Sequence, residues 1–170
     1  MPEYHIYIGA DHRGFQKKEE LFDLIKDCHE NVIVEDLGAD SLNPDDDFND
    51  PAIAVGVAVR QNEHNLGVLI CGSAHGVTMQ ANRLKGVRAI NADTEQSAIA
   101  GREDDHANVL CLSGDQLDVE TMEKIVKAFC HAHPKQDKRY VRRVKRLDEE
   151  LAKPTKFSLQ HDAEDDDEEE

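Results

Sequence analysis

The sequence of 170 residues predicts an α/β protein, a three-layer doubly wound sandwich around a five-stranded parallel sheet. Two observations lead to this prediction. Short apolar runs alternate with amphipathic stretches up to Phe129, and most links between them are short. Strands in such an order pair in parallel, because right-handed crossovers return each helix to a face of the sheet. The length is sufficient for one domain with a core of its own.

The first half of the chain is expected to form two strands and two helices. His5–Gly9 is the first predicted strand and Val32–Val34 is the second. Between them, apolar residues recur at helical spacing: Phe15, Leu21, Leu24, Ile25 and Cys28. After a polar loop over residues 38–49, Asp50 and Pro51 predict a helix start, because a carboxylate can cap a helix and proline fits its first position.

The second half continues the alternation. The expected elements are a strand over Gly67–Cys71, a helix over Val77–Leu84, a strand over Val87–Ile90, a helix over Thr94–Arg102, a strand over Asn108–Leu112 and a long helix marked by Val119, Met122, Ile125, Val126 and Phe129. Ligands of such sheets bind beyond the carboxyl ends of the strands. The loops Ala10–Gly14, Cys71–Gly76 and Ala92–Thr94 are therefore expected to share one rim.

The character of the chain changes after Pro134. Residues 135–146 are strongly basic, and apolar residues fall on one helical stripe: Tyr140, Val144, Leu147 and Leu151. This stripe packs either on its own domain or on a second subunit, and the pattern does not choose between them. We assign residues 1–153 to one domain and residues 154–170 to an acidic tail.

The net charge of −16 narrows the possible partners. Residues 162–170 supply eight carboxylates, and we expect this tail to be disordered, either as a solubilising segment or as a partner-binding arm. The rest of the chain is still acidic, which argues against nucleic-acid binding. No apolar signal segment precedes the first strand and no run is long enough to span a bilayer, so a cytoplasmic protein without a membrane partner is expected.

The stretch from Val68 to Gly76 is the most informative in the chain. A short apolar run ends on Cys71, and the small-residue loop Gly72–Gly76 leads into a helix. Unpaired backbone N–H groups at such a junction bind anions and can stabilise an oxyanion, and a helix start favours the thiolate form of a nearby cysteine. The alternative is that Cys71 is a small buried hydrophobe. The other cysteines, Cys28, Cys111 and Cys130, are expected in the core, and no CxxC spacing suggests zinc.

Two further groups of polar residues are candidates for binding an anionic sugar. Asp11, His12 and Arg13 follow the first strand and either bind sugar hydroxyls and phosphate or serve only to cap the helix and face solvent. Arg139 and Arg143 lie four residues apart on one helical face, either as phosphate ligands or as part of a solvated basic stripe paired with acids at residues 148–150.

Over residues 4–147 the chain resembles the family of ribose-5-phosphate isomerase B and galactose-6-phosphate isomerase. Six motifs in the right order carry the resemblance: Gly9-Ala10-Asp11-His12-Arg13-Gly14-Phe15, Ile70-Cys71-Gly72-Ser73, Ala81-Asn82-Arg83, Gly86-Val87-Arg88-Ala89, Asn108-Val109-Leu110 and the Arg139/Arg143 pair. The resemblance implies interconversion of aldose and ketose sugar phosphates through an enediolate, without a metal or cofactor. It also implies dimers or tetramers with shared active sites.

The resemblance also implies roles for individual residues. Cys71 is the expected general base, and the backbone of Gly72, Ser73, Ala74, His75 and Gly76 is expected to cradle the enediolate. Asp11 and His12 are expected to hold the sugar. Asp105 and Asn108 are expected to bind substrate, and Arg139 and Arg143 to bind its phosphate in a neighbouring subunit's site.

The chain departs from the family pattern at several site positions. Asp104 stands where the ring-opening histidine is usual, with Asp105 at the following asparagine position, and Asp115 replaces an arginine after the fifth strand. We therefore hypothesise that His75 or Asp104, both expected on the rim, opens the sugar ring. In the family a tyrosine is common directly before the proline, whereas this chain has Asp50 before Pro51. Phe48 is the residue that could supply an aromatic ring in its place.

The leading interpretation is an isomerase of ribose 5-phosphate and ribulose 5-phosphate. The alternative is a noncatalytic sugar-phosphate-binding or regulatory protein on the same scaffold, which the acidic substitutions favour. A thiol redox protein is a weaker third interpretation, because no resolving cysteine lies near Cys71 in the sequence.

Overall fold

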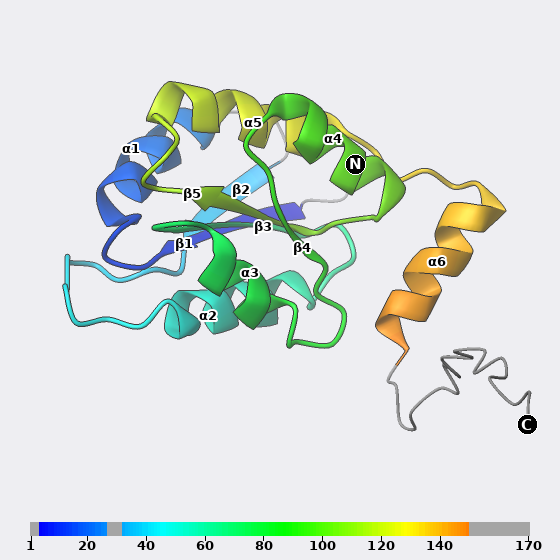
Figure 1. The fold of residues 1–170 in the computed structure, drawn as a ribbon, viewed down its shortest axis with the longest axis horizontal. Coiled ribbons are helices and arrows are strands. Elements are labelled where there is room, and N and C mark those ends of the chain that lie inside the picture. Colours follow the sequence, from blue (N-terminus) through cyan, green and yellow to red (C-terminus); the bar gives the residue numbers. More distant parts are fainter. Residues whose placement is uncertain (1–3, 27–31, 150–170) are drawn as a thin grey trace, which may run out of the picture.

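The computed structural model describes residues 4–26 and 32–149. Five parallel strands form one sheet in the order β2-β1-β3-β5-β4 (Figure 1), which confirms the predicted α/β architecture. The elements are β1 (Tyr4–Ala10), α1 (Phe15–Ile25), β2 (Val32–Asp36), α2 (Asn49–Val59), β3 (Leu66–Cys71), α3 (His75–Ala81), β4 (Ala89–Asn91), α4 (Glu95–Asp104), β5 (Val109–Ser113), α5 (Val119–His131) and α6 (Lys138–Asp148).

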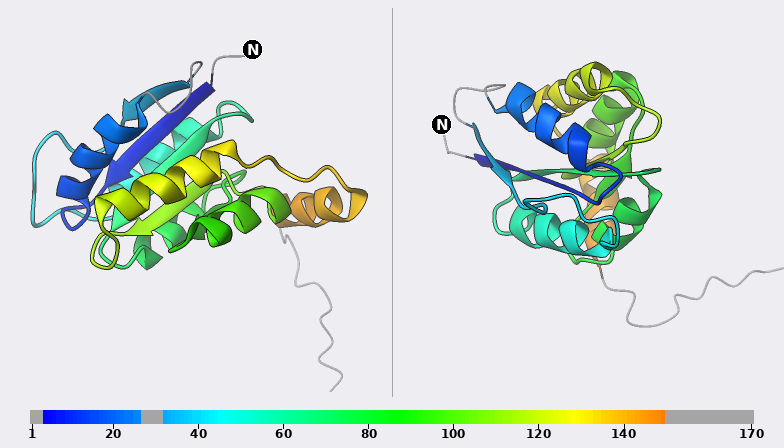
Figure 2. Two further views of the ribbon diagram at one scale, coloured as in Figure 1. Left: turned by 90° about the horizontal axis from the view of Figure 1, so that it is seen from above. Right: turned by 90° about the vertical axis from the view of Figure 1, so that its left-hand side faces the viewer.

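Helices cover both faces of the sheet (Figures 1 and 2). α1, α4 and α5 lie on one face, and α2 and α3 lie on the other. All six residues of the central strand β3 are buried. Its side chains alternate between two apolar cores: Val68 and Ile70 pack toward α1 and α5, whereas Leu69 and Cys71 pack toward α2 and α3. A strand buried on both faces explains the continuous apolar run that ends at Cys71.

Some element boundaries differ from those predicted. α2 begins at Asn49 with Phe48 at its N-cap position, so Asp50 lies inside the first turn and does not cap the helix. α3 begins at His75, two residues before the predicted start, because Ala74 takes a left-handed conformation with φ of 66° and turns the chain directly into the helix. Of the apolar residues that recur at helical spacing in α1, Leu21 and Ile25 are buried, whereas Leu24 is 42% exposed. Cys28 lies outside the described residues.

The terminal helix α6 projects beyond the amino ends of the strands, away from the rim at their carboxyl ends (Figures 1 and 2). On its predicted apolar stripe Val144 is buried, but Leu147 is 64% exposed. The stripe is therefore only partly covered by its own chain. Leu151 and the acidic tail lie outside the described residues. Among the helices that the structure describes, none is long and apolar enough to cross a membrane.

Candidate active site

The candidate site is built around the loop that joins β3 to α3. Cys71 is the last residue of β3 and its side chain is 4% exposed, while Ser73 and His75 are exposed. The left-handed Ala74 makes the loop short, so that only three residues separate Cys71 from the helix. The Thr78 hydroxyl donates to the Ala74 carbonyl at 2.7 Å and fixes this turn from within α3.

The last residue of β5 and the two residues after it hold the same loop from the neighbouring strand. The Gly114 N–H donates to the Cys71 carbonyl at 2.7 Å, and the Asp115 N–H donates to the Gly72 carbonyl at 3.1 Å. The Ser113 hydroxyl donates to the Gly72 carbonyl at 2.7 Å. The backbone beside Cys71 is thus fixed before a ligand binds, which is the condition for preorganised stabilisation of a developing charge.

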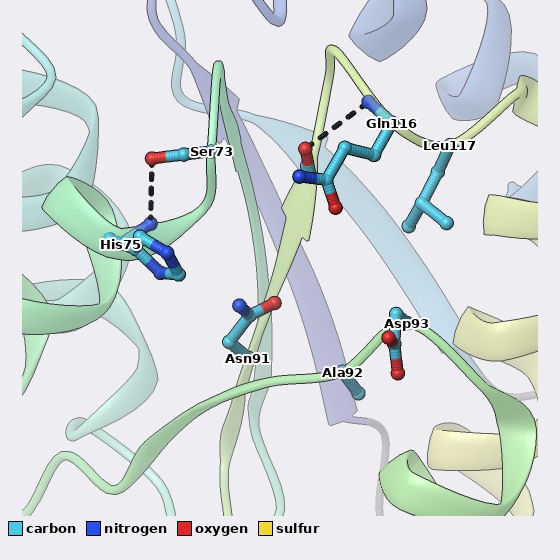
Figure 3. Close-up of a pocket in the computed structure, with 8 residues that line it drawn as sticks. Ser73, His75, Asn91, Ala92, Asp93, Gln116 and Leu117 are labelled. Atoms are coloured by element: carbon cyan, nitrogen blue, oxygen red, sulfur yellow. Dashed lines mark hydrogen bonds between the residues drawn. The ribbon is translucent and has the colours of Figure 1, made fainter.

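A pocket of about 190 Å³ opens beside this loop (Figure 3). It is lined by residues from three strand ends: Ser73, His75, Asn91, Ala92, Asp93, Ser113, Gln116 and Leu117. The His75 ring faces the space bounded by Asn91 and Gln116 (Figure 3). The predicted juxtaposition of the Cys71–Gly76 loop and the Ala92–Thr94 loop is confirmed.

The turn after β1 adds Asp11 and His12 to the rim. Asp11 is buried, and its Oδ1 accepts from the backbone N–H of Arg13 at 2.9 Å and of Gly14 at 3.1 Å. Burial raises the pKa of Asp11, and the two N–H donors and His12 act in the opposite direction. The carboxylate therefore holds the turn that leads into α1, although the N-cap position itself is Gly14.

His12 is oriented by a residue that the sequence pattern did not single out. Its Nδ1 lies 2.7 Å from Asp46 Oδ1, and its backbone N–H donates to the same oxygen at 3.0 Å. Asp46 belongs to the polar loop between β2 and α2. This loop contains many Asp and Asn residues, so the sequence does not distinguish Asp46 from its neighbours. In the same segment the Phe48 ring lies against Gly76, so this aromatic side chain does reach the Cys71–Gly76 loop.

A second group of predicted site residues lies at the opposite edge of the sheet. Asp104, Asp105 and Asn108 precede β5, whereas Cys71 pairs with Ser113 at the end of that strand. Five residues of strand separate the two edges by roughly 15 Å. The expectation that Asp104 shares the rim with His75 is therefore wrong within one chain, because β5 runs from the one edge to the other.

Arg139 and Arg143 belong to this second group. Lys135 binds Asp104 at 2.6 Å, and the cationic groups of Lys135, Arg139 and Arg143 lie 5.3, 4.9 and 6.0 Å from the centre of the Tyr140 ring. The structure thus brings Asp104 and both arginines into one cluster, which we call the Tyr140 cluster: Asp104, Lys135, Arg139, Tyr140 and Arg143. The hydrogen bonds to Asp104 and Glu103 raise the pKa of Lys135.

Asn108 and Asp148 are both bound within the chain. The Asn108 side chain accepts from the Arg88 N–H and donates to the Gly86 carbonyl, both at 2.8 Å. Asp148 accepts from Arg88 at 3.0 Å, so this acid does not pair with the arginines of α6 as the sequence suggested. Asp105 is exposed at the end of α4.

The cysteines of the described residues differ in setting. Cys71 and Cys111 are buried free thiols, and Cys130 is buried in the core on the side of α1, α4 and α5. Cys111 lies one strand away from Cys71 on the same face of the sheet, and complete burial raises its pKa to about 12. Cys71 stands where the sheet opens to the rim. Within residues 4–26 and 32–149, no group of three or more His, Cys, Asp and Glu side chains could hold a metal ion.

The protein has a doubly wound parallel sheet, and a thiol, a fixed loop and a polar pocket lie at the carboxyl edge of that sheet. It therefore belongs to the class of α/β proteins that bind ligands at this edge. Comparison with known proteins gives the family. The model of the Ribose/Galactose Isomerase family matches residues 6–147. The chain therefore belongs to this family, and it is an isomerase.

Individual relatives agree with this assignment. A probable ribose-5-phosphate isomerase B from Mycoplasma genitalium is 38% identical over 131 residues, which cover 76% of this chain and 85% of the relative. D-erythrulose-4-phosphate isomerase 2 from Mycolicibacterium smegmatis is 31% identical over 124 residues, covering 73% of this chain and 82% of that protein. The crystal structure of the M. genitalium isomerase with bound ribulose-5-phosphate superposes with a TM-score of 0.80 at 35% identity, covering 87% of this chain and 96% of that one.

Proposed function

We propose that this isomerase interconverts ribose 5-phosphate and ribulose 5-phosphate, with Cys71 as the general base. The observation that carries the proposal is the position of Cys71, at the end of a buried strand and beside a backbone loop held by β5. The names of the relatives and the ribulose-5-phosphate in the neighbouring structure support the choice of substrate.

The reaction needs one base that reaches two adjacent carbons. The thiolate removes the proton from C2 of the open-chain aldose, and the electron pair forms the C1–C2 double bond of the enediolate while charge moves to O1. The proton then returns to C1. At the same time the proton of the O2 hydroxyl passes to O1, so that O2 becomes the ketone oxygen and O1 becomes the hydroxyl of C1. Donors from the loop Gly72–Gly76 would stabilise the oxygen charge in both halves. We also propose that Asp11 and His12, on the turn after β1, bind sugar hydroxyls.

We further propose that a second copy of the chain completes each site. Arg139, Arg143, Asp104, Asp105 and Asn108 lie at the far edge of their own sheet, so they can meet Cys71 only in another subunit. Large apolar side chains left exposed on α2, α3 and α6 support such a contact: Ile53, Val57, Met79 and Leu147. A symmetric pairing of two such faces would bring the Tyr140 cluster of one protomer to the rim of its partner.

Ring opening requires an acid–base group besides Cys71. We propose His75 for this role, because it lines the pocket on the same rim as the thiol. Asp104 is the second candidate: it would arrive with the partner's Tyr140 cluster, already bound to Lys135. Because the base must be a free thiol, we expect the enzyme to work in a reducing compartment such as the cytosol.

The proposal is tested by a coupled isomerase assay on a panel of tetrose, pentose and hexose phosphates. The tetrose is included because one relative is named for a four-carbon substrate. We expect the highest kcat/KM with ribose 5-phosphate and ribulose 5-phosphate. Preference for another sugar phosphate would correct the substrate and leave the reaction class intact. Binding of the sugar phosphates without turnover of any would instead identify a noncatalytic sugar-phosphate-binding protein.

A further inference from the structure

Arg13 covers the loop that begins at the candidate base. A Cβ placed on Gly72 would lie 2.1 Å from Arg13 Cζ and 2.3 Å from Arg13 Nε. The guanidinium therefore occupies the space that a side chain at position 72 would fill, and it lies directly on the backbone. The Cys71 side chain lies on the α2–α3 face of the sheet. The positively charged guanidinium of Arg13 lies beside Gly72, the residue that follows Cys71.

Arg13 is held in this place by Asp115, which follows β5. The Arg13 Nη2 forms an ion pair with Asp115 Oδ2, and the two side chains are 52% and 46% exposed. Among the described residues, the guanidinium donates a hydrogen bond to Asp115 and to no other side chain or carbonyl. A guanidinium carries five N–H donors in a planar fork. Donors therefore remain for a ligand at the rim, at a position where water and small molecules have access.

The surroundings of the pair are fixed and carry a second cation. The Asp115 N–H is bound to the Gly72 carbonyl, so the ion pair and the loop cannot move independently. Lys17 Nζ donates to the Gly114 carbonyl at 2.7 Å and to the Leu117 carbonyl, which places an ammonium beside the same turn. Arg139 and Arg143 lie at the opposite edge. Among the described residues, Arg13 is thus the arginine that lies on the chain's own Cys71–Gly76 loop.

We propose that Arg13 is a phosphate-binding residue of this site and that Asp115 limits its affinity. The inference rests on the proposed function, which supplies a sugar phosphate as the ligand. A guanidinium fork matches the oxygens of a phosphate group, and such charge-assisted hydrogen bonds are among the strongest in proteins. The Asp115 carboxylate competes for the same donors and repels the dianion. The pair therefore sets how tightly this rim holds phosphate and how readily it releases it.

The test compares Arg13→Gln, Arg13→Lys, Asp115→Asn and the double variant R13Q/D115N in the full chain. Calorimetry measures binding of inorganic phosphate and of ribose 5-phosphate, and the isomerase assay gives KM and kcat. Arg60→Gln is the matched control, because Arg60 is exposed at the far end of α2. Circular dichroism and thermal unfolding confirm that each variant is folded.

We expect Arg13→Gln to weaken binding of both ligands and to raise KM by about tenfold, with a much smaller change in kcat, and Arg13→Lys to fall between it and the unaltered chain. Asp115→Asn should tighten phosphate binding by about threefold to tenfold, and this gain should be lost in the R13Q background. Arg60→Gln should change nothing. Unchanged phosphate affinity in Arg13→Gln, or a gain from Asp115→Asn that persists without Arg13, overturns the inference.

These outcomes are separable from the fate of the proposed function. Phosphate binding requires no turnover, so an inactive protein that loses phosphate affinity in Arg13→Gln retains the Arg13 site and loses the isomerase proposal. Normal isomerase activity with unchanged KM and phosphate affinity in Arg13→Gln has the reverse meaning: the function stands and the role of Arg13 falls.

Discussion

The imidazole of His12 is bound by the carboxylate of Asp46, with His12 Nδ1 2.7 Å from Asp46 Oδ1. The same oxygen accepts the His12 backbone N–H, so one carboxylate fixes both the ring and the peptide of a rim residue. An imidazole held through Nδ1 leaves Nε2 for the sugar hydroxyl that we propose His12 binds. In the proposed site, Asp46 would therefore be a positioning residue that acts through His12.

Replacing Asp46 should impair catalysis through the orientation of His12. We expect Asp46→Ala to lower kcat/KM by about 10-fold to 100-fold, because a misplacement of 1 Å can cost a factor of that size. Asp46→Asn retains an oxygen acceptor and should lose much less. Asp45→Ala, one residue earlier in the same loop and exposed, is the control. Equal losses in Asp46→Ala and Asp45→Ala would show that the loop is merely perturbed and that the His12 contact has no part.

Cys71 and Cys111 form a natural pair for testing the base. Both are buried free thiols on one face of the sheet, and only Cys71 stands at the rim. We expect Cys71→Ala to reduce kcat by at least about 100-fold, which is the usual contribution of a general base. Its free energy of unfolding should stay within about 1 kcal/mol of that of the unaltered chain. Cys111→Ala should retain kcat within a small factor. Near-normal turnover in Cys71→Ala would remove this thiol from the mechanism.

Much of this fold can be predicted from the sequence because its signals are local. The β3 run is buried on both faces and reads as an unbroken apolar strand, and the helix signal of α5 is equally clear. Boundaries were predicted less well where a single backbone conformation decides them. Ala74 adopts a left-handed φ that nothing in a small-residue loop specifies, and it moves the start of α3 to His75.

The arrangement of the candidate residues can be predicted only in part. The strand order does indicate the edge of the sheet: Asp104 precedes the strand predicted over Asn108–Leu112 and so belongs at the amino edge, away from the rim. Cys71 and His75 were placed correctly from strand ends, whereas Asp104 was assigned to the wrong edge. Long-range partners were also missed. The sequence shows that Asp115 replaces an arginine of the family pattern, but it does not show the partner of Asp115. That partner is Arg13, 102 positions away, whose guanidinium binds the carboxylate.

His75 is the rim residue to test for ring opening. We expect His75→Asn to slow turnover of the cyclic aldose by about 100-fold, the lower range for acid–base catalysis, while open-chain substrate is turned over nearly as before. Asp104→Asn, measured in parallel, tests the second candidate. Stopped-flow assays started from the ketose, which has no furanose ring to open at the 5-phosphate, provide the open-chain reference. If neither variant acts selectively on the cyclic form, another group opens the ring.

A shared site should be visible by mixing two inactive variants. One protein carries Cys71→Ala and the other carries Arg139→Ala with Arg143→Ala. If the Tyr140 cluster of one protomer serves the rim of its partner, a mixed dimer contains one site with both defects and one with neither. Co-refolding at equal amounts should then restore about a quarter of the original activity, because half of random dimers are mixed and each has one intact site. Light scattering checks the dimer, and absence of any recovery in mixed dimers would contradict the proposal that the Tyr140 cluster completes the partner's site.

Lys18 allows a stability prediction that is independent of the reaction. Its side chain is fully buried, and its ammonium binds Asp36 and, at 2.5 Å, Glu19. Burial acts to lower the pKa of Lys18, but the bonds to Asp36 and Glu19 outweigh it and raise the pKa above 10.5. A raised pKa in the folded state contributes stability below the unfolded value, and this contribution is lost as the pH rises through the folded pKa.

We therefore expect the urea-unfolding free energy of the unaltered chain to fall above pH 10.5 more steeply than that of Lys18→Met. Tyr7, whose pKa is also raised by burial, titrates in both proteins and cancels in the difference. Asp36→Ala should cost about 3 kcal/mol at pH 7, because it leaves a buried ammonium with Glu19 as its remaining carboxylate, whereas Asp23→Ala on the exposed side of α1 should cost little. Parallel curves for Lys18→Met and the unaltered chain up to pH 11.5 would show that the Lys18 ammonium does not contribute to stability.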